Sequence, residues 1–318
     1  MVTGGAGFIG SALVRKLVQN PHFHILNIDN LTYAANPNAL SGVSGLSNYR
    51  LERMDICNKD KLLQVVNDFD PDVVFHLAAE SHVDNSIADA SIFVQSNIVG
   101  TAVLLDACRQ TWRERKLQPR FIFVGTDEVY GANKSDSPYL ETQAFAPSSP
   151  YSASKAAATH LVQSWQITYG FPTIISHSTN NYGPFQHPEK LLPKALLMAA
   201  QGKSIPIYGD GNHQRDWLYV DDHVNALILL MKIGVLGETY HIGTEQLHTN
   251  NELLLTLSNA IKARTSDHLE VKTHFVEDRL GHDSCYWIDT SKIRQLGWSP
   301  KVSLEEGISQ LVAAYHLD

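Results

Sequence analysis

The stretch Gly4-Gly5-Ala6-Gly7-Phe8-Ile9-Gly10 follows a short run, Met1–Thr3, and opens a segment of helical period, Ser11–Gln19. Glycines at such positions allow a tight turn, a close approach of backbone to a pyrophosphate, and close contact between helix and sheet. The free amide groups and the dipole at the start of a helix favour an anion. We therefore predict that a dinucleotide pyrophosphate binds at Gly4, Gly7, Phe8, Ile9 and Gly10.

An acidic residue supports this interpretation over that of a purely structural glycine turn. Asp29 lies nineteen positions beyond Gly10, at the end of the next predicted strand. A carboxylate there can accept hydrogen bonds from both hydroxyl groups of an adenosine ribose and would repel a 2′-phosphate. The predicted cofactor is therefore NAD, with Asp29 as one of its ligands.

Short β-branched runs alternate with amphipathic stretches of helix length in the first half of the chain. This alternation predicts an α/β fold, a Rossmann-like doubly wound parallel sheet covered by helices on both faces. The predicted strands are Met1–Thr3, His24–Asp29, Arg50–Met54, Asp72–Leu77, Arg120–Thr126 and Thr173–His177. The predicted helices between them are Ser11–Gln19, Asp60–Phe69 and Asn97–Trp112.

The regular alternation of strands and helices ends after about Tyr182. Turn signals and further helical stretches beyond it predict a smaller C-terminal α/β lobe that binds substrate. We expect an NAD-binding Rossmann domain over residues 1–178 and a substrate lobe over 179–318. A segment at about 217–245 is expected to return to the first domain.

The composition of the 318 residues excludes several classes of protein. Lys and Arg total 25 against 33 Asp and Glu, and a net charge of −8 argues against binding to nucleic acid. Cys57, Cys108 and Cys285 form an odd set without metal-clip spacing, which predicts a reducing, cytoplasmic location. The apolar stretch Ala226–Leu236 contains Lys232 and is too short to span a bilayer, so no membrane association is expected.

Small and polar residues end the third and fourth predicted strands. In open α/β sheets, ligands bind beyond the carboxyl ends of the strands. Asp55 and Ile56 are therefore predicted to meet the adenine, and Leu77, Ala78 and Ala79 to give the cofactor room. For Leu77–Ala79, ordinary core packing is the alternative.

A tyrosine and a lysine share one face of a later helix. Ser149 and Pro150 are typical of an N-cap and a first helical position, and Tyr151 and Lys155 follow four residues apart. Lysine and an oxidised nicotinamide ring would both favour phenolate and lower the pKa of Tyr151 from its usual value near 10. Such a phenolate can take a hydroxyl proton while hydride leaves the same carbon, and Thr126 could bind the same hydroxyl.

The glycine turn, Asp29 and the pair Tyr151 and Lys155 resemble the extended short-chain dehydrogenase/reductase superfamily. Epimerases, decarboxylases, reductases and dehydratases share that fold, so the fold does not name the reaction. The resemblance implies that Asn97 and Asn181 also contact the cofactor.

Two adjacent acids, Asp127 and Glu128, follow the strand that ends at Thr126. A solvated loop or a helix cap would be the structural explanation of such a pair. At the rim of a cofactor cleft, however, oxidation of one sugar carbon acidifies the hydrogen on its neighbour. One carboxylate can then remove that proton while a protonated carboxyl expels a hydroxyl group as water. We assign Glu128 as the base and Asp127 as the acid.

The segments 77–84, 126–131, 180–184, 188–191 and 215–218 are similar to those of the dTDP-glucose 4,6-dehydratase family. The resemblance implies C4 oxidation by bound NAD with Tyr151 as base, elimination of water across C5 and C6, and return of the hydride to C6. The product would be dTDP-4-keto-6-deoxyglucose. The resemblance also implies nucleotide-sugar contacts at Ser81, Thr126, Asn180, Lys190, Leu191, Pro206, Tyr208, Arg215, Asn250, Arg279, His282 and Tyr286.

The chain departs from that family where Leu280 replaces a usual proline, Ser284 and Cys285 replace two usual arginines, and Gly125 stands where serine is commoner. These changes bear on nucleotide affinity and on the choice of base more than on the chemistry.

Three alternatives to a dTDP-glucose 4,6-dehydratase stay open: a dehydratase for UDP or another nucleotide sugar, a 4-epimerase of the same fold, and an NAD-dependent sensor. An epimerase would have no need of Asp127 and Glu128. The fifteen histidines lack the spacing of a zinc site, so no metal is predicted. The apolar faces of Asn97–Trp112 and of the helix with Tyr151 predict a homodimer, because such helices pair across a two-fold in relatives.

Overall fold

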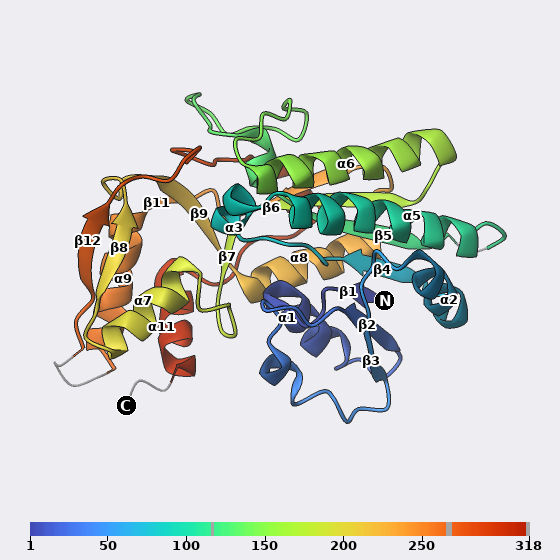
Figure 1. Cartoon of the computed structure of the whole chain (residues 1–318), viewed down its shortest axis with the longest axis horizontal. Coiled ribbons are helices and arrows are strands. Elements are labelled where there is room, and N and C mark those ends of the chain that lie inside the picture. The colour runs from blue at the N-terminus through green and yellow to red at the C-terminus, as the bar shows by residue number, and fades with distance from the viewer. Residues whose placement is uncertain (116–117, 265–268, 316–318) are drawn as a thin grey trace.

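Seven parallel strands form the central sheet of the computed structural model, which describes residues 1–115, 118–264 and 269–315 (Figure 1). The strand order is β10-β6-β5-β4-β1-β2-β3. The order reverses at β1 and β4, and ligands of open α/β sheets bind at this switch point. The strands are β1 (Val2–Thr3), β2 (Ile25–Asp29), β3 (Tyr49–Arg53), β4 (Val73–His76), β5 (Arg120–Thr126), β6 (Thr173–Ser178) and β10 (Thr239–Ile242).

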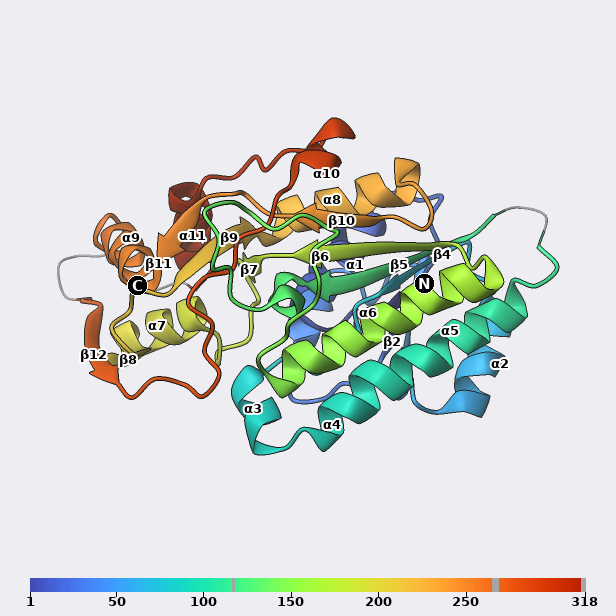
Figure 2. The ribbon, with the colours of Figure 1, turned by 90° about the horizontal axis from the view of Figure 1, so that it is seen from above.

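Helices cover both faces of this sheet, as Figure 2 shows. On one face, α1 (Phe8–Leu17) and α8 (Val220–Ile233) pack their leucines and valines against alternate β5 residues such as Ile122. On the other face, α2 (Lys59–Phe69), α5 (Gly100–Thr111) and α6 (Pro150–Tyr169) enclose a second core with Phe121 and Phe123. Burial on both sides explains why β5 is apolar without interruption.

The helix predicted to start at Asn97 starts six residues earlier. After α3 (Val83–Ala88), α4 (Ser91–Phe93), the π-helical turn η2 (Val94–Val99) and α5 run on without a break. By length and composition, Ser91–Thr111 could cross a membrane. In the fold, however, its buried Leu104 and Leu105 pack in the core shared with α2 and α6, as in a helix of a globular domain.

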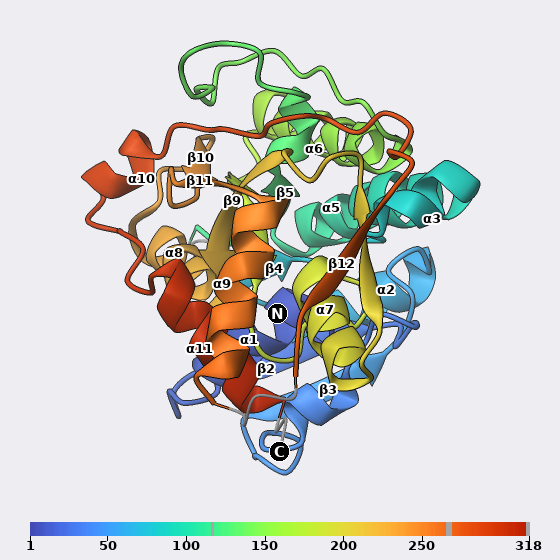
Figure 3. The same cartoon turned by 90° about the vertical axis from the view of Figure 1, so that its left-hand side faces the viewer.

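The second lobe is built on two small sheets and a separate core (Figure 3). One sheet contains β7 (Asn180–Tyr182), β9 (Gln214–Tyr219) and β11 (Leu247–Thr249), and the other pairs β8 (Ser204–Tyr208) with β12 (Lys272–Val276). The helices of this lobe are α7 (Leu191–Ala200), α9 (Asn250–Lys262) and α11 (Leu304–Ala314). The remaining short elements are η1 (Pro37–Leu40), η3 (Asp127–Tyr130) and α10 (Ser291–Gln295).

The predicted fold class is confirmed, and the predicted strands of the first half agree with β1 to β6 to within about one residue. β10 joins the central sheet beside β6, in parallel, although it lies late in the chain. The domain boundaries at 178 and 179 stay a prediction.

Candidate active site

A cavity of about 1150 Å³ lies at the carboxyl ends of the central strands and extends to the second lobe. All but one of the predicted site residues line it. The predicted cofactor contacts in its wall are Gly4, Gly7, Phe8, Ile9, Gly10, Asp29, Asp55, Ile56, Leu77, Ala78, Ala79 and Asn181. Beside them are Thr126, Asp127, Glu128, Tyr151 and Lys155, and then Ser81, Asn180, Lys190, Leu191, Pro206, Tyr208, Arg215, Asn250, Arg279, His282 and Tyr286.

The glycine turn has the close-packed form that a dinucleotide requires. Gly4 has φ +74°, and a Cβ on it would lie 2.6 Å from the backbone nitrogen of Ala78. A Cβ on Gly10 would lie 2.1 Å from the carbonyl oxygen of Gly4. No side chain caps α1 at Gly7, so the first amide groups of the helix stay available to an anion. The turn therefore fits the pyrophosphate of NAD.

Asp29 ends β2 with its carboxylate tied to the glycine turn. Oδ2 accepts from the backbone N–H of Ala6, and Oδ1 accepts from that of Leu31, both at 2.8 Å. Each carboxylate oxygen has a further lone pair, so Asp29 can still receive the ribose hydroxyl groups. Leu77 serves in both of its possible roles, because it packs against the core and lines the cavity.

Asn97 is the exception, because it does not line the cavity. Its side chain is 1% exposed and lies behind the chain that follows β4. Oδ1 accepts from the Glu80 N–H at 2.8 Å, and Nδ2 donates to the Glu80 carbonyl at 3.0 Å and to Ser154 Oγ at 2.8 Å. Asn97 therefore holds the cavity wall in place from outside the cavity.

α6 begins as predicted, with Ser149 as N-cap and Pro150 as the first helical residue. Ser149 and Ser152 form a reciprocal capping box, which fixes the helix start next to Tyr151. One turn later, the Lys155 Nζ donates to the Val124 carbonyl at 2.8 Å. Burial lowers the pKa of Lys155 to about 7.

The predicted lowering of the Tyr151 pKa is not supplied by the protein alone. Burial raises the pKa of Tyr151, Glu128 and Asp127 raise it further, and a hydrogen bond with Thr126 opposes them. The phenol is therefore protonated in the protein by itself, and positive charge from an oxidised nicotinamide is needed to favour the phenolate.

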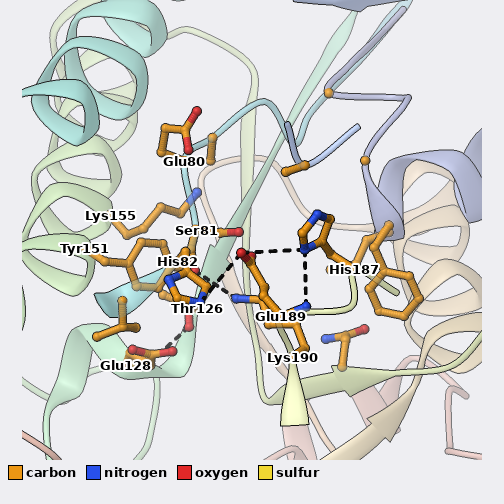
Figure 4. A pocket seen from close by; sticks show the side chains of 18 of the residues that line it. Glu80, Ser81, His82, Thr126, Glu128, Tyr151, Lys155, His187, Glu189 and Lys190 are labelled. Carbon is orange, nitrogen blue, oxygen red and sulfur yellow. Dashed lines mark hydrogen bonds and ion pairs between the residues drawn. The ribbon is translucent and has the colours of Figure 1, made fainter. Parts of the chain in front are cut away.

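Thr126, Asp127 and Glu128 lie where β5 passes into η3, with Thr126 and Glu128 beside Tyr151 in Figure 4. The Thr126 hydroxyl caps the turn by accepting from the Glu128 N–H at 3.3 Å. Asp127 is 2% exposed, and its Oδ2 has no hydrogen-bond partner. Burial, Glu128 and Asp216 raise the pKa of Asp127 well above its ordinary value, which favours the protonated acid.

Glu128 lies in a different environment. Burial raises its pKa as well, but positive side chains from the second lobe oppose this effect and favour the carboxylate. These cations are Arg215, Lys190 and Arg279.

Contacts between the two lobes cross the cavity, and some involve residues that the sequence had not singled out as site residues. Glu189 lies 3.6 Å from His82 Nε2 and 3.5 Å from His187 Nδ1 (Figure 4). Lys190 Nζ donates to the Ser81 carbonyl at 3.1 Å. Glu189 and His187 flank Pro188, and Glu189 lies in the segment 188–191 that resembles the dehydratase family.

The two arginines among the expected nucleotide-sugar contacts are held by the protein before any substrate arrives. Arg215 is 7% exposed, donates to the Asp283 carbonyl at 2.7 Å and stacks over the Tyr286 ring at 4.4 Å. Arg279 Nε lies 2.6 Å from Asp84 Oδ1 across the cavity. Such preorganised guanidinium groups suit a diphosphate.

Among the described residues, His213, Asp278 and His282 form a group whose ligand atoms all lie within 4.8 Å. Asp278 already accepts from His282 Nδ1 at 2.6 Å and lies 3.3 Å from His213 Nε2. The two imidazole rings stack with centroids 3.9 Å apart. Hydrogen bonding accounts for this cluster, and the chain is still predicted to need no metal.

The family model described as GDP-mannose 4,6 dehydratase matches residues 1–311. A dTDP-glucose 4,6-dehydratase of Neisseria gonorrhoeae is 46% identical over 327 residues, which cover 99% of this chain and 94% of that protein. A crystal structure of dTDP-glucose 4,6-dehydratase from Streptomyces venezuelae, with NAD and TYD bound, has a TM-score of 0.91 at 39% identity. That match covers 99% of this chain and 95% of the other.

The chain belongs to the dTDP-glucose 4,6-dehydratase family. Its fold is shared more widely, because a UDP-glucose 4-epimerase from Thermotoga maritima matches with a TM-score of 0.88 at 31% identity. That match covers 99% of this chain and 97% of the epimerase. The residues in the cavity, and not the fold, must therefore distinguish the two reactions.

Proposed function

We propose that this chain is an NAD-dependent dTDP-glucose 4,6-dehydratase that forms dTDP-4-keto-6-deoxyglucose. The observation that carries the proposal is the convergence of Tyr151, Asp127 and Glu128 on one cavity that also contains the glycine turn. A 4-epimerase needs a base at the hydroxyl that is oxidised, but it has no step that uses two further carboxyl groups.

The cofactor supplies a hydride acceptor that takes the C4 hydrogen and later returns it at C6. The glycine turn and Asp29 would hold its pyrophosphate and adenosine ribose, while Tyr151 accepts the proton of the C4 hydroxyl. Thr126 orients the same hydroxyl from the end of β5. Lys155 supports the phenolate from the next turn of α6.

The acid pair, Asp127 and Glu128, carries out the elimination of water. Glu128 accepts the C5 proton, which the C4 ketone has acidified, and Asp127 donates its proton to the C6 hydroxyl as the C6–O bond breaks. A C5–C6 double bond and one water result. Glu128 then returns its proton to C5 as C6 is reduced. The acidic neighbours of Asp127 and the three cations near Glu128 support this division of roles.

The substrate would lie between the acid pair and the second lobe. Arg215, Lys190 and Arg279 are suited to neutralise its diphosphate. The base would meet the wall formed by Leu191, Pro206 and Tyr208. We assign thymine to this pocket on the likeness to the dTDP-glucose dehydratases.

Incubation of the purified protein with dTDP-glucose tests the proposal. Loss of one water by mass, with retention of the nucleotide, is the expected result. Unchanged mass with formation of a galactose nucleotide would indicate an epimerase, and absence of turnover would indicate an NAD-dependent sensor. A parallel reaction with UDP-glucose tests the choice of base, and a higher kcat/KM for the uridine sugar would contradict the assignment.

We further propose that the enzyme is a cytoplasmic homodimer. α4, η2 and α5 lie beside α6 on the outside of the molecule (Figure 2), and this surface exposes 54% of Ile92, 38% of Val99 and 79% of Ile167. Apolar side chains on neighbouring helices suit burial against a second copy. A protein that sediments only as a monomer at micromolar concentration would rule this assembly out.

A further inference from the structure

Tyr130 ends the η3 turn that carries Asp127 and Glu128, and two buried histidines hold its hydroxyl group. The Tyr130 oxygen lies 2.8 Å from Nδ1 of His177 in β6 and 2.8 Å from Nε2 of His241 in β10. The three side chains are at most 2% exposed, and none of them lines the cavity. Any part that they play in the reaction must therefore act through the turn.

The hydrogen bonds of this group run in one direction. The His241 Nδ1 lies 3.1 Å from the Asp289 carbonyl, which can only accept, so Nδ1 carries the proton. Burial lowers the pKa of His241 to about 3 and keeps the ring neutral, so its Nε2 is an acceptor. Tyr130 consequently donates to His241 and accepts from Nδ1–H of His177. We call these three side chains the Tyr130 relay.

His177 also fills the space over Gly125, which precedes the segment 126–128, whereas Tyr130 follows that segment. A Cβ on Gly125 would lie 2.3 Å from Cδ2 of His177, closer than any real contact. The two residues are register partners in neighbouring strands. The histidine therefore accounts for the glycine that stands where the family more often has serine. The acidic turn is fixed before Thr126 by this packing and after Glu128 by the hydroxyl of Tyr130.

We propose that the Tyr130 relay positions the acid pair for elimination of water, an inference that rests on the proposed dehydratase function. The capping box at Ser149 fixes the start of α6 next to Tyr151, whereas Thr159 of α6 lies further along the helix with its Oγ1 3.4 Å from Nε2 of His177. C4 oxidation should therefore depend on the relay much less than elimination does. The elimination step needs two carboxyl groups on one short turn at fixed places around C5 and C6. A misplacement of about 1 Å can cost about 100-fold in rate.

Tyr130→Phe removes the hydroxyl group and keeps the ring. We expect C4 oxidation to change little and elimination to be slowed by about 10- to 100-fold. Reduced nicotinamide should then accumulate in the first turnover, as seen by its absorbance after rapid mixing. Tyr139→Phe is the matched control, because Tyr139 packs edge-on against Tyr130 and donates to the Ala132 carbonyl at 3.2 Å, outside the relay.

Equal slowing of both steps by Tyr130→Phe, or of neither, would overturn the proposal. If the unchanged protein itself oxidises C4 without losing water, the dehydratase assignment fails and the role of the relay in elimination fails with it. Normal dehydration by both proteins leaves the assignment standing and overturns the relay alone.

A second pair of variants tests the relay without removing Tyr130. Gly125→Ala adds the Cβ that collides with His177, and we expect it to lower the elimination rate and the melting temperature. His177→Asn in the same chain frees that space and keeps a side-chain N–H near the position of Nδ1. The double variant should recover elimination by about 10-fold over the single one. A double variant no faster than Gly125→Ala would contradict the positioning role.

Discussion

Asp127 and Glu128 are neighbours in the chain, yet different charged groups surround their carboxyl groups. Burial raises the pKa of both, but Glu128 and Asp216 raise that of Asp127 further, whereas three cations of the second lobe favour the carboxylate of Glu128. A 3₁₀ turn makes this possible, because consecutive side chains on it point in different directions. One short segment can thus present an acid and a base to adjacent carbons of one sugar.

Glu128→Gln removes the base while keeping the size of the side chain. We expect dTDP-glucose to be oxidised at C4 but not dehydrated, with product formation reduced by about 10²- to 10⁴-fold. Reduced nicotinamide should build up to the level set by its equilibrium with the C4 ketone, because without the C5–C6 double bond the hydride can return only to C4. Mass spectrometry of the sugar and absorbance of the cofactor measure the two steps.

Glu245→Gln is a suitable control for that experiment. Glu245 is an exposed carboxylate that accepts from the N–H of Thr290 at 2.8 Å, and it lies outside the cavity. The Glu245→Gln protein should dehydrate the sugar at the rate of the unchanged protein. Unchanged turnover by Glu128→Gln would show that another group removes the C5 proton.

Asp127→Asn should remove the acid, and its effect should depend on the leaving group at C6. The amide cannot protonate a departing hydroxyl, so dehydration of dTDP-glucose is expected to fall by about 10²- to 10⁴-fold. Fluoride leaves without a proton, so the variant's rate of elimination from a 6-fluoro-6-deoxyglucose nucleotide should fall much less. Equal losses with both substrates would contradict the role of Asp127.

The pH dependence provides a separate test of Asp127. Burial raises the pKa of Asp127 well above its ordinary value, so the group stays protonated to a higher pH than an exposed aspartate and is lost as a donor as the pH rises through that raised value. The elimination rate should therefore decline on the alkaline side, and Asp127→Asn should lack that limb. An elimination rate in the unchanged protein that rises over the same range would be incompatible with an acid at this position.

Tyr151→Phe is expected to stop the reaction earlier than either carboxyl variant. Without a base for the C4 hydroxyl, neither reduced nicotinamide nor dehydrated sugar should form, although NAD and the substrate should still bind. Binding can be followed by calorimetry and turnover by cofactor absorbance. A Tyr151→Phe protein that still reduces its cofactor within one turnover would transfer the role of base to a different group.

The sequence was most informative where local rules and the fold agree. The glycine turn, the acid at Asp29 and the capped start of α6 each have a short-range physical cause, and all three were predicted at the right residues. The start of the helix before Asn97 was missed because its first turns contain Ser91 and a π-turn, neither of which gives a strong helix signal.

Long-range packing was beyond the reach of sequence patterns. Asn97 reads as a polar residue near the cofactor cleft, but its bonds to Glu80 show that it supports the wall from behind. The pKa of Tyr151 depends on burial and on Glu128, which only the assembled cavity reveals. The need for a glycine at position 125 comes from the close packing of His177 against it, which no sequence pattern shows.

Lys155 lowers the free energy of unfolding of the protein. Its pKa is about 7 when folded against 10.5 when exposed, so the unfolded chain binds more protons between these values. The free energy of unfolding of the cofactor-free protein should therefore rise as the pH rises from about 7 toward 10.5. Below about pH 7 the folded state carries a buried charge, and Lys155→Met should stabilise it there by a few kcal/mol while abolishing turnover.

Urea unfolding at about pH 6 and about pH 10 measures this effect. The gain from Lys155→Met should be large at the lower pH and small at the higher, because a neutral lysine and a methionine fill the site alike. Lys61→Met serves as the control, since Lys61 is 43% exposed and pairs with Glu52 at 2.9 Å at the surface. It should change stability little at either pH. A gain from Lys155→Met that is equal at both values would mean that the cost lies in packing and not in the buried charge.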